Sequence, residues 1–345
     1  MKFLLNDIVA NTPDAATGHR PTQRDRLRSV VERAVRAEEL GIDAVSVGER
    51  HGGYFLSSSP AVLLSAIGER TSRVRLLTGV TVLSILDPVR VAEEFATLDN
   101  LSDGRVELIV SKGNHPDQYS LFGLDESLQW DYLAEKYELL RRLWEPEPVT
   151  WSGRFRTPLT GVTTQPRPLQ RRITVWHGSA TSERSTDLAA RHGDPLFTAN
   201  GFHRRARYAR LVDHYRERWA HYGRAPEDAV VAASFPSLLV ADTSQKALEL
   251  FRPVWEAFAA SPTFKHNKSE ITTVEEFVGE GSALVGSPAQ IIDKLGEYHE
   301  LFGHELTGIS VEHTPAGLKE ETLERFAAEV APAIRAGQSS RVWAD

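Results

Sequence analysis

Short apolar runs alternate with amphipathic segments along the whole chain, and this alternation constrains the fold more than any other feature. The runs have the length and apolar content of buried parallel strands. The segments between them carry apolar residues at helical spacing, as Leu27, Val30 and Ala34 do after the first run. The predicted strands lie at residues 3–9, 44–47, 74–82, 106–110, 173–176, 195–199, 230–240 and 306–311. Helices are expected between them, among them 244–259 after the seventh strand and 318–334 after the eighth.

Eight strand–helix units in 345 residues predict an α/β protein built as a single (β/α)8 TIM barrel. A doubly wound sheet is the alternative, but it needs fewer strands or two halves, and no GxGxxG motif follows the first strand. Two segments do not fit a plain connection, and we interpret them as insertions that shape a substrate pocket. The first, about 145–172, follows strand four and is expected to be partly a hairpin; the second, about 260–284, follows strand seven. We predict one domain over residues 1–345.

Composition excludes several classes of function. The net charge of −7 argues against nucleic acid or an anionic membrane as the main partner. The absence of cysteine excludes disulfides, thiolate metal sites and a cysteine nucleophile. The N-terminal "MKFLLNDIVANTPD" has an apolar run too short for a signal peptide, and no segment approaches the roughly 18 apolar residues of a spanning helix. We therefore expect a cytoplasmic protein.

Polar residues collect where the predicted strands end, which is where active sites form in a barrel. The second strand ends in Glu49, Arg50 and His51 within "VSVGERHGGY". The other polar strand ends are "SKGNH" at 111–115, "HGSATS" at 177–182, Asn200, and the pair Glu312 and His313. We expect these ends to meet at one mouth of the barrel.

The segment "GSATSERS" predicts an anion site. Its small residues lead into a helix, so backbone N–H groups can point at a ligand, and the hydroxyl groups of Ser179 and Ser182 add donors. Lys112 can add a cation from the neighbouring strand end, and a phosphate would fit this arrangement. The alternative is that Ser179, Thr181 and Ser182 only cap the helix. The two roles are compatible.

The histidines at the strand ends are weaker evidence for a functional site than the anion-binding segment. A single histidine at a strand end is more often a hydrogen-bonding core residue than a catalyst, but four at one mouth favour a catalytic site. The four are His51, His115, His177 and His313. No HxH or HExxH pair occurs and the acidic residues are not spaced as ligands, so we predict no metal site.

Three stretches together resemble the bacterial luciferase-like flavin monooxygenases, and the resemblance covers nearly the whole chain. They are "GIDAVSVGERHGGY", "SPAVLLSAIGERTSRVRLLTGVTVLSILDPVRVAEEFATLDNLSDGRVELIVSKGNH" and "GSATSERSTDLAARHGD". The block from Pro88 to Arg105 is the most specific part of the match. The resemblance implies a (β/α)8 barrel that uses reduced FMN or, in one branch of the family, a deazaflavin coenzyme (F420).

The resemblance also implies roles for single residues. Lys112 stands where luciferases place an arginine that grips the flavin phosphate, and Ser179 and Ser182 fall in the segment that wraps this phosphate. Gly79–Val80 stands where many members have a non-proline cis peptide behind the flavin ring, and Ser111 stands where luciferase has a reactive cysteine. The candidate cofactor-binding residues are Thr78, Gly79, Val80, Ser111, Lys112, His177, Gly178, Ser179 and Ser182.

One position departs from the family pattern. The family commonly has Glu-His-His after strand two, whereas this chain has Glu49, Arg50 and His51. Arginine cannot act as a base near neutral pH, so the proton route of luciferase cannot be transferred to this chain. Adjacent residues should also point in different directions, so His51 should not point where Arg50 points. Arg50 could bind an anionic substrate, stabilise the anionic reduced flavin, or form an ion pair with Glu49 or Glu94.

The predicted function is an FMN-dependent monooxygenase that takes reduced FMN from a separate flavin reductase and uses dioxygen to oxygenate a small organic substrate. The candidate catalytic residues are His51, His115, Arg50 and Asn114, and we expect His51 or His115 to handle protons. The alternatives are a deazaflavin-dependent dehydrogenase or reductase on the same barrel, and a non-catalytic flavin-binding protein. A homodimer is expected, with the apolar helices around 61–67 and 91–98 at its interface.

Overall fold

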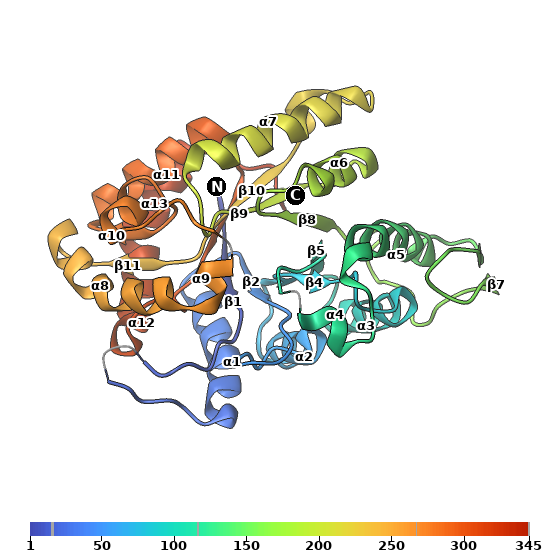
Figure 1. Ribbon diagram of the computed structural model, residues 1–345, viewed down its shortest axis with the longest axis horizontal. Helices are drawn as coiled ribbons and strands as arrows, with labels where there is room; N and C mark the ends of the chain where they lie inside the picture. The colour runs from blue at the N-terminus through green and yellow to red at the C-terminus, as the bar shows by residue number, and fades with distance from the viewer. Residues whose placement is uncertain (15–16, 116, 267, 344–345) are drawn as a thin grey trace.

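A closed barrel of parallel strands forms the centre of the computed structural model, which describes residues 1–14, 17–115, 117–266 and 268–343 (Figure 1). Its strands are β1 (Lys2–Asp7), β2 (Ala44–Val47), β3 (Arg75–Thr78), β5 (Val106–Ser111), β8 (Val175–Ser179), β9 (Leu196–Ala199), β10 (Val231–Phe235) and β13 (Leu306–Ile309). Each pairs in parallel with the next, and β13 pairs with β1 to close the ring. The predicted (β/α)8 barrel is confirmed.

Two predicted strands are each divided in the structure. The run at 74–82 becomes β3 and the short β4 (Thr81–Val82), which are separated by the cis peptide bond between Gly79 and Val80. The run at 230–240 becomes β10 and β11 (Leu238–Val240). Pro236 lies between these two strands, and proline cannot donate to a strand ladder.

The second insertion is larger than predicted, because β11 leaves the barrel and pairs with β12 (Leu284–Gly286). Between them lie α8 (Ser244–Ala260), α9 (Pro262–His266) and α10 (Val274–Gly279). The helix expected at 244–259 is present as α8, and it packs against β12 and α10, so it belongs to this insertion and not to the outer ring of helices. The ring position is taken by α11 (Pro288–Phe302), which contacts α7 and α13.

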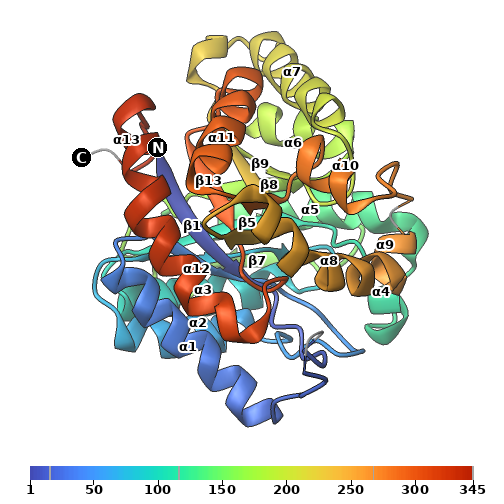
Figure 2. The same cartoon turned by 90° about the vertical axis from the view of Figure 1, so that its left-hand side faces the viewer.

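The remaining helices surround the strands. They are α1 (Gln23–Glu39), α2 (Pro60–Arg70), α3 (Pro88–Leu101), α4 (Asp117–Leu121), α5 (Gln129–Trp144), α6 (Glu183–His192), α7 (Arg205–His221), α12 (Lys319–Arg325) and α13 (Ala331–Gly337). A π-helical turn (Phe326–Val330) joins α12 to α13, where the sequence predicted one unbroken helix. Figure 2 shows α12 beside α1, and Arg36 of α1 bonds Glu320 and Glu324 of α12. These contacts between α1 and α12 thus help to hold the ring closed.

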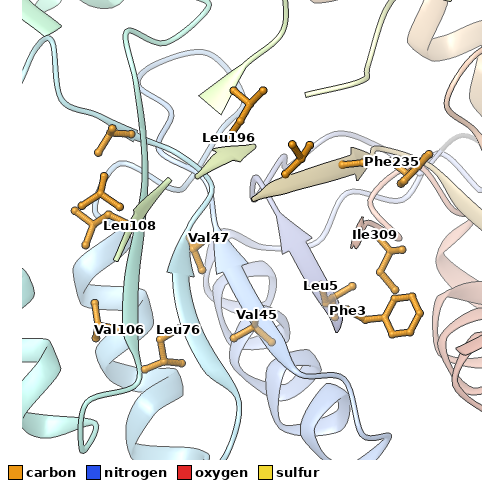
Figure 3. Close-up of a cluster of buried hydrophobic side chains, with 14 of the residues drawn as sticks. Phe3, Leu5, Val45, Val47, Leu76, Val106, Leu108, Leu196, Phe235 and Ile309 are labelled. Carbon is orange, nitrogen blue, oxygen red and sulfur yellow. The ribbon is translucent and has the colours of Figure 1, made fainter. Parts of the chain in front are cut away.

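Alternation along the strands creates two apolar layers. Phe3 and Leu5 belong to the large core between the strands and the helices, and Figure 3 shows such side chains on several strands. Leu4, which lies between them, belongs to a separate cluster that also contains Trp176 and Phe197. Successive residues of a strand point to opposite faces, so this second cluster fills the barrel interior. The same alternation decides which side chains at the strand ends can reach the mouth.

The first insertion contains the expected antiparallel hairpin, formed by β6 (Val149–Trp151) and β7 (Leu159–Val162) at the right edge of Figure 1. The second insertion has its own apolar core, in which Phe251, Trp255 and Phe277 are buried. None of the helices in the described ranges is long and apolar enough to cross a bilayer. That the whole chain acts as one domain stays a prediction.

Candidate functional site

A cavity of about 1000 Å³ opens at the carboxyl ends of the barrel strands. Each barrel strand contributes to its lining through its own last residues or the loop that follows. Examples in strand order are Asn6, Arg50, Gly79, Ser111, Ser179, Asn200, Pro236 and Glu312. This is the place where a barrel of this kind carries its active site.

Most of the predicted site residues line this cavity. Those that do are Arg50, Gly79, Val80, Ser111, Lys112, Asn114, Gly178, Ser179 and Ser182. Four others do not contribute to the lining: Thr78, His51, His115 and His177. The sequence therefore predicted most of these lining residues, but three of the four expected histidines lie outside the cavity.

One side of the cavity, which we call the serine side, consists of Lys112, Ser179, Ser182 and the start of α6. Ser179 donates a hydrogen bond to the carbonyl oxygen of Ser182 at 3.1 Å. Ser182 occupies the N-cap position of α6, but its side chain makes no capping hydrogen bond. The interpretation that Ser182 caps this helix was therefore wrong, and its hydroxyl remains available to a ligand beside the helix N-terminus.

Lys112 completes the serine side. Its Nζ donates to the carbonyl oxygen of Gly113 at 3.0 Å and lies 5.5 Å from the centre of the Trp130 ring. Among the described residues no carboxylate forms an ion pair with it. Burial lowers the pKa of Lys112, while Glu126 acts in the opposite direction. A lysine of this kind beside a helix start and two serines is suited to an anion.

Backbone forms the floor of the cavity at the ends of β3 and β8. The Gly79–Val80 peptide bond is cis, as the family resemblance implied. A Cβ atom on Gly79 would lie 2.6 Å from Oδ1 of Asn6, and one on Gly178 would lie 3.1 Å from Cγ1 of Val80. Any side chain at Gly79 would therefore force its neighbours apart, and the floor stays flat because both positions are glycine.

Arg50 lies in the cavity without an ion pair to any of the described residues. Its guanidinium donates to Oδ1 of Asn114 and lies 5.4 Å from the centre of the Phe55 ring. The hypothesis of an ion pair with Glu49 or Glu94 was wrong, because Glu49 contacts His51 at 2.8 Å and Glu94 pairs with Arg90 at 2.6 Å. Burial lowers the pKa of Arg50, and Glu312 partly offsets this effect.

Three of the predicted histidines lie outside the cavity. His51 Nε2 contacts Glu49 and its ring packs edge-on against Phe122 at 4.7 Å. The side chain of His115 is 41% exposed and lies 3.9 Å from Asp117. His177 is buried behind the barrel wall, where Nε2 lies 3.3 Å from the carboxylate of Asp194.

These positions correct the expected roles. His177 lies on the helix side of β8, one residue before Gly178, so it cannot bind a cofactor at the mouth. The hydroxyl of Thr78 likewise bonds the backbone of Ile109 at 3.0 Å and 3.2 Å, which joins β3 to β5. Of the four histidines expected at the mouth, His313 lines the cavity. Burial, followed by the charge of Lys319, lowers the pKa of His313 to about 4.

The opposite side of the cavity is lined by Arg26, Arg33, Glu312 and Lys319, and we call these residues, together with Asp7 behind them, the ion-pair side. Arg26 bonds Asp7 at 2.5 Å and Glu312 at 3.2 Å, and Arg33 bonds Asp7 at 2.8 Å. Glu312 also accepts hydrogen bonds from two backbone N–H groups of the loop after β1. Glu312 stood at a predicted strand end, but its partners could not be identified from the sequence.

Burial determines the charge of the ion-pair side. It would raise the pKa of Asp7, but Arg26 and Arg33 together hold that pKa well below its usual range. Burial, and next the charge of Asp7, raise the pKa of Glu312 to about 7. Burial, and next the charge of Arg33, lower the pKa of Lys319 to about 8, and no described carboxylate pairs with this lysine. No motif or strand end in the sequence identified Lys319 as a residue of the cavity.

Asn200, at the end of β9, carries a further unmet hydrogen-bonding need. It is 1% exposed, and neither its amide oxygen nor its amide nitrogen has a hydrogen-bond partner among the residues that the structure describes. Because Asn200 lines the cavity, both groups are available to a bound molecule. No three His, Asp or Glu side chains in the described part of the chain are grouped to hold a metal ion.

The insertions contribute unequally to the cavity. Val254, Ala257 and Phe258 of α8 line it, together with Phe202 after β9. None of the lining residues comes from 145–172, so the expectation that this hairpin shapes the pocket was wrong. The hairpin instead lies against α5, where Glu135 accepts hydrogen bonds from the backbone N–H groups of Arg154 and Phe155.

The comparisons with known proteins agree on one family. The family model described as "Luciferase-like monooxygenase" matches residues 1–305. An F420-dependent glucose-6-phosphate dehydrogenase of Kribbella flavida is 28% identical, covering 89% of this chain and 94% of the relative. The 4-hydroxyprotoasukamycin monooxygenase of Streptomyces nodosus subsp. asukaensis is also 28% identical, covering 86% of this chain and 83% of the relative.

Solved structures agree with these sequence matches. Monooxygenase RslO1 from Streptomyces bottropensis superposes with a TM-score of 0.79 and 26% identity, covering 96% of this chain and 99% of that one. The oxygenating constituent of 3,6-diketocamphane monooxygenase from Pseudomonas putida, in complex with FMN, has a TM-score of 0.78 at 19% identity and covers 99% of this chain and 100% of that one. At that identity the second match supports the fold alone.

Proposed function

Because the chain belongs to the luciferase-like monooxygenase family, we propose that it binds reduced FMN in the cavity and oxygenates a small organic substrate with dioxygen. When bound, the reduced flavin supplies the electrons that activate dioxygen, and a separate flavin reductase supplies the flavin. The observation that carries this proposal is the combination, in one cavity, of the serine side with the flat glycine floor.

The chain's own residues fit such a cofactor. Lys112, Ser179 and Ser182 would hold its phosphate, and the backbone at Gly79 and Gly178 would lie beneath its ring. The buried amide of Asn200 offers a donor and an acceptor that no group in the described part of the chain uses. The cavity volume of about 1000 Å³ is at the upper end of the range for ligand pockets, which leaves room for a substrate beside the cofactor.

Two measurements test the proposal. Anaerobic titration with reduced FMN should show saturable binding to the wild-type protein. Purified protein, a flavin reductase and NADH should then consume dioxygen in proportion to added substrate in a screen of small organic molecules. If reduced FMN does not bind at micromolar concentrations, the FMN assignment fails. If it binds but no substrate is ever oxygenated, the non-catalytic flavin-binding alternative gains support.

A second function has its own support. The F420-dependent relative matches 89% of this chain, so a deazaflavin-dependent dehydrogenase on the same barrel is the other candidate. Both cofactors carry a phosphate, and the serine side suits either one. Parallel fluorescence titrations with F420 and FMN separate the two candidates, since the protein should bind its own cofactor more tightly. Substrate-dependent reduction of F420 without dioxygen would replace our first proposal with the second.

We also propose a homodimer in which α2 and α3 lie at the interface. The two helices pack side by side on the barrel, and Val62 on α2 is 69% exposed. A self-complementary C₂ contact would bury this side chain. Light scattering at micromolar concentration should give the mass of a dimer, and the mass of a monomer would contradict the proposal.

A further inference from the structure

Two cations in the cavity have no use in the proposed binding of the cofactor phosphate. They are Arg50, at the end of β2, and Lys319, at the start of α12. Neither forms an ion pair with a carboxylate of the described residues. A cation held in a cavity without a counter-charge is costly, and such groups are normally paired or contact a ligand.

Nearby carboxylates are already committed to other partners. Asp7 is bound by Arg26 and Arg33, and Glu312 is bound by Arg26 and by the backbone N–H groups of Ile8 and Ala10. Glu49 accepts a hydrogen bond from the backbone N–H of Val82 at 2.8 Å and contacts His51. None of these acids can turn to Arg50 or Lys319 without losing its present bonds.

The strand order separates Lys319 from the serine side, whereas Arg50 reaches Asn114 in the loop after β5. Around the ring, the pair β13 and β1 lies opposite the pair β5 and β8, because two strands intervene on each side. Lys319 follows β13, whereas Lys112 and Ser179 follow or end β5 and β8. Arg50 follows β2, next to β1. Glu312 lines the same cavity as Arg50 and Lys319. Its charge partly offsets the lowering of both pKa values by burial.

The wall beside these cations is apolar and aromatic. Phe55 lies under the guanidinium of Arg50, with 5.4 Å between the guanidinium carbon and the ring centre. Phe202 and Phe258 also line the cavity, and their rings stack on each other at 6.0 Å. A ligand here would meet two cations at one end and aromatic rings along its body.

We infer that Arg50 and Lys319 bind an anionic group of the substrate, a carboxylate or a phosphate, and that the substrate's apolar body lies against Phe55, Phe202 and Phe258. This inference rests on the proposed function, since it assumes that the flavin phosphate occupies the serine side. It also gives the arginine that replaces the family's first histidine after strand two a role in substrate selection. The substrate class is thus an amphiphilic acid with an aromatic or other apolar body.

The experiment uses protein saturated with FMN, or with F420 if the second candidate function holds, so that the serine side is already filled. Isothermal titration calorimetry at low salt compares benzoate with its neutral analogue benzamide, and phenyl phosphate forms a third arm. The variants are Arg50→Met and Lys319→Met. Matched controls remove one exposed charge each: Arg90→Met, at a side chain 72% exposed, and Lys246→Met, at one 59% exposed.

Benzoate should bind wild type and both controls about tenfold or more tightly than benzamide. Arg50→Met and Lys319→Met should each lose most of that preference while flavin affinity stays at the wild-type value. The phenyl phosphate arm shows which of the two anions the site prefers. Equal affinity for benzoate and benzamide, or no measurable binding of either, would overturn the inference.

Two further outcomes separate this inference from the proposed function. If Arg50→Met weakens flavin binding and leaves the benzoate preference intact, Arg50 belongs to the cofactor site and the inference is wrong. If neither flavin binds the wild-type protein, the proposed function itself fails. A melting curve of each variant checks its folding, and Arg50→Lys, which keeps the charge, should retain part of the preference for benzoate.

Discussion

The serine side and the ion-pair side face each other across one cavity but are built in different ways. The serine side comes from two short stretches, 111–114 and 178–182, and relies on backbone, hydroxyl groups and one lysine. The ion-pair side joins residues from both ends of the chain, with Glu312 bonding the backbone N–H of Ile8, 304 positions away. The first can form as soon as its strands form, whereas the second requires the closure of β13 on β1.

This difference predicts that substitutions on the two sides affect different properties of the protein. A side built from backbone and hydroxyl groups loses ligand affinity when one residue changes, but it loses little stability. A side built from interlocked buried charges loses stability first, because removing one partner leaves another charge buried without compensation. The predictions below test this division.

The largest expected effect is on stability, from Arg26→Met. Arg26 is buried and holds both Asp7 and Glu312, so its loss leaves two carboxylates without their shared cation. We expect the free energy of unfolding to fall by about 3–5 kcal/mol. Urea denaturation followed by circular dichroism measures this change. Arg28→Met, on an exposed position of the same helix, is the control and should change stability by less than about 0.5 kcal/mol.

The contrasting change on the serine side is Lys112→Ala. Because Lys112 is expected to donate a charged hydrogen bond to the cofactor phosphate, flavin affinity should fall roughly tenfold to hundredfold at low salt, or about 1.5–3 kcal/mol. The deficit should shrink at high salt, since salt screens the interaction. Stability should stay near that of the wild type. Unchanged flavin affinity at low salt would remove Lys112 from the site, and Lys246→Ala controls for the loss of charge.

The charge of Lys319 predicts a pH dependence on the ion-pair side. Its pKa is lowered to about 8 by burial and Arg33, against the opposing effect of Glu312. Lys319 is charged below that pH and loses its proton as the pH rises through it. The loss of this proton should therefore lower benzoate affinity about fivefold between pH 7 and pH 9, if the bound anion raises the pKa of Lys319 by about one unit.

The neighbouring charges are the controls for this titration. A guanidinium group keeps its charge throughout this range. His313, with a pKa of about 4, remains neutral above pH 6. Glu312, with a pKa of about 7, loses its proton at the lower end of this range and would also weaken anion binding. Lys319→Met should remove the change above pH 8 and leave any effect of Glu312 below it. The same pH dependence in Lys319→Met would exclude Lys319 as its source.

The two sides also show how far a sequence can be read. Lys112, Ser179 and Ser182 could be predicted to line the cavity because each lies within a few residues of a recognisable strand end. The connection from Glu312 to Arg26 and Asp7 could not be predicted, because no local pattern encodes contacts made by barrel closure. Within one strand, the limit is a single position: Gly178 lines the cavity, whereas His177 faces Asp194 behind the wall. Successive side chains of a strand always alternate between the two faces, but which of them face the cavity at the end of the strand depends on the local twist.

The smallest expected effect concerns the two histidines first chosen for proton transfer. Neither His51 nor His115 lines the cavity, and Nε2 of His51 is occupied by Glu49 at 2.8 Å. His51→Gln and His115→Gln should therefore each leave substrate turnover within about threefold of wild type, which is under ~1 kcal/mol of barrier. Steady-state rates with saturating reduced flavin measure this, and flavin titrations check that the cofactor still binds.

A larger effect at one position would change the comparison between the two sides. General acid–base catalysis normally contributes about 10²-fold or more, so a loss of that size with flavin binding intact would mean that the histidine reaches the substrate. For His51 this would require the ring to leave Glu49 and turn past Phe122, whereas for His115 it would require the exposed loop after β5 to fold inward. Small effects in both variants would instead leave proton transfer to groups that line the cavity. Of these, Glu312, with a pKa near 7, belongs to the ion-pair side, so that side would then hold the chemistry while the serine side holds the cofactor.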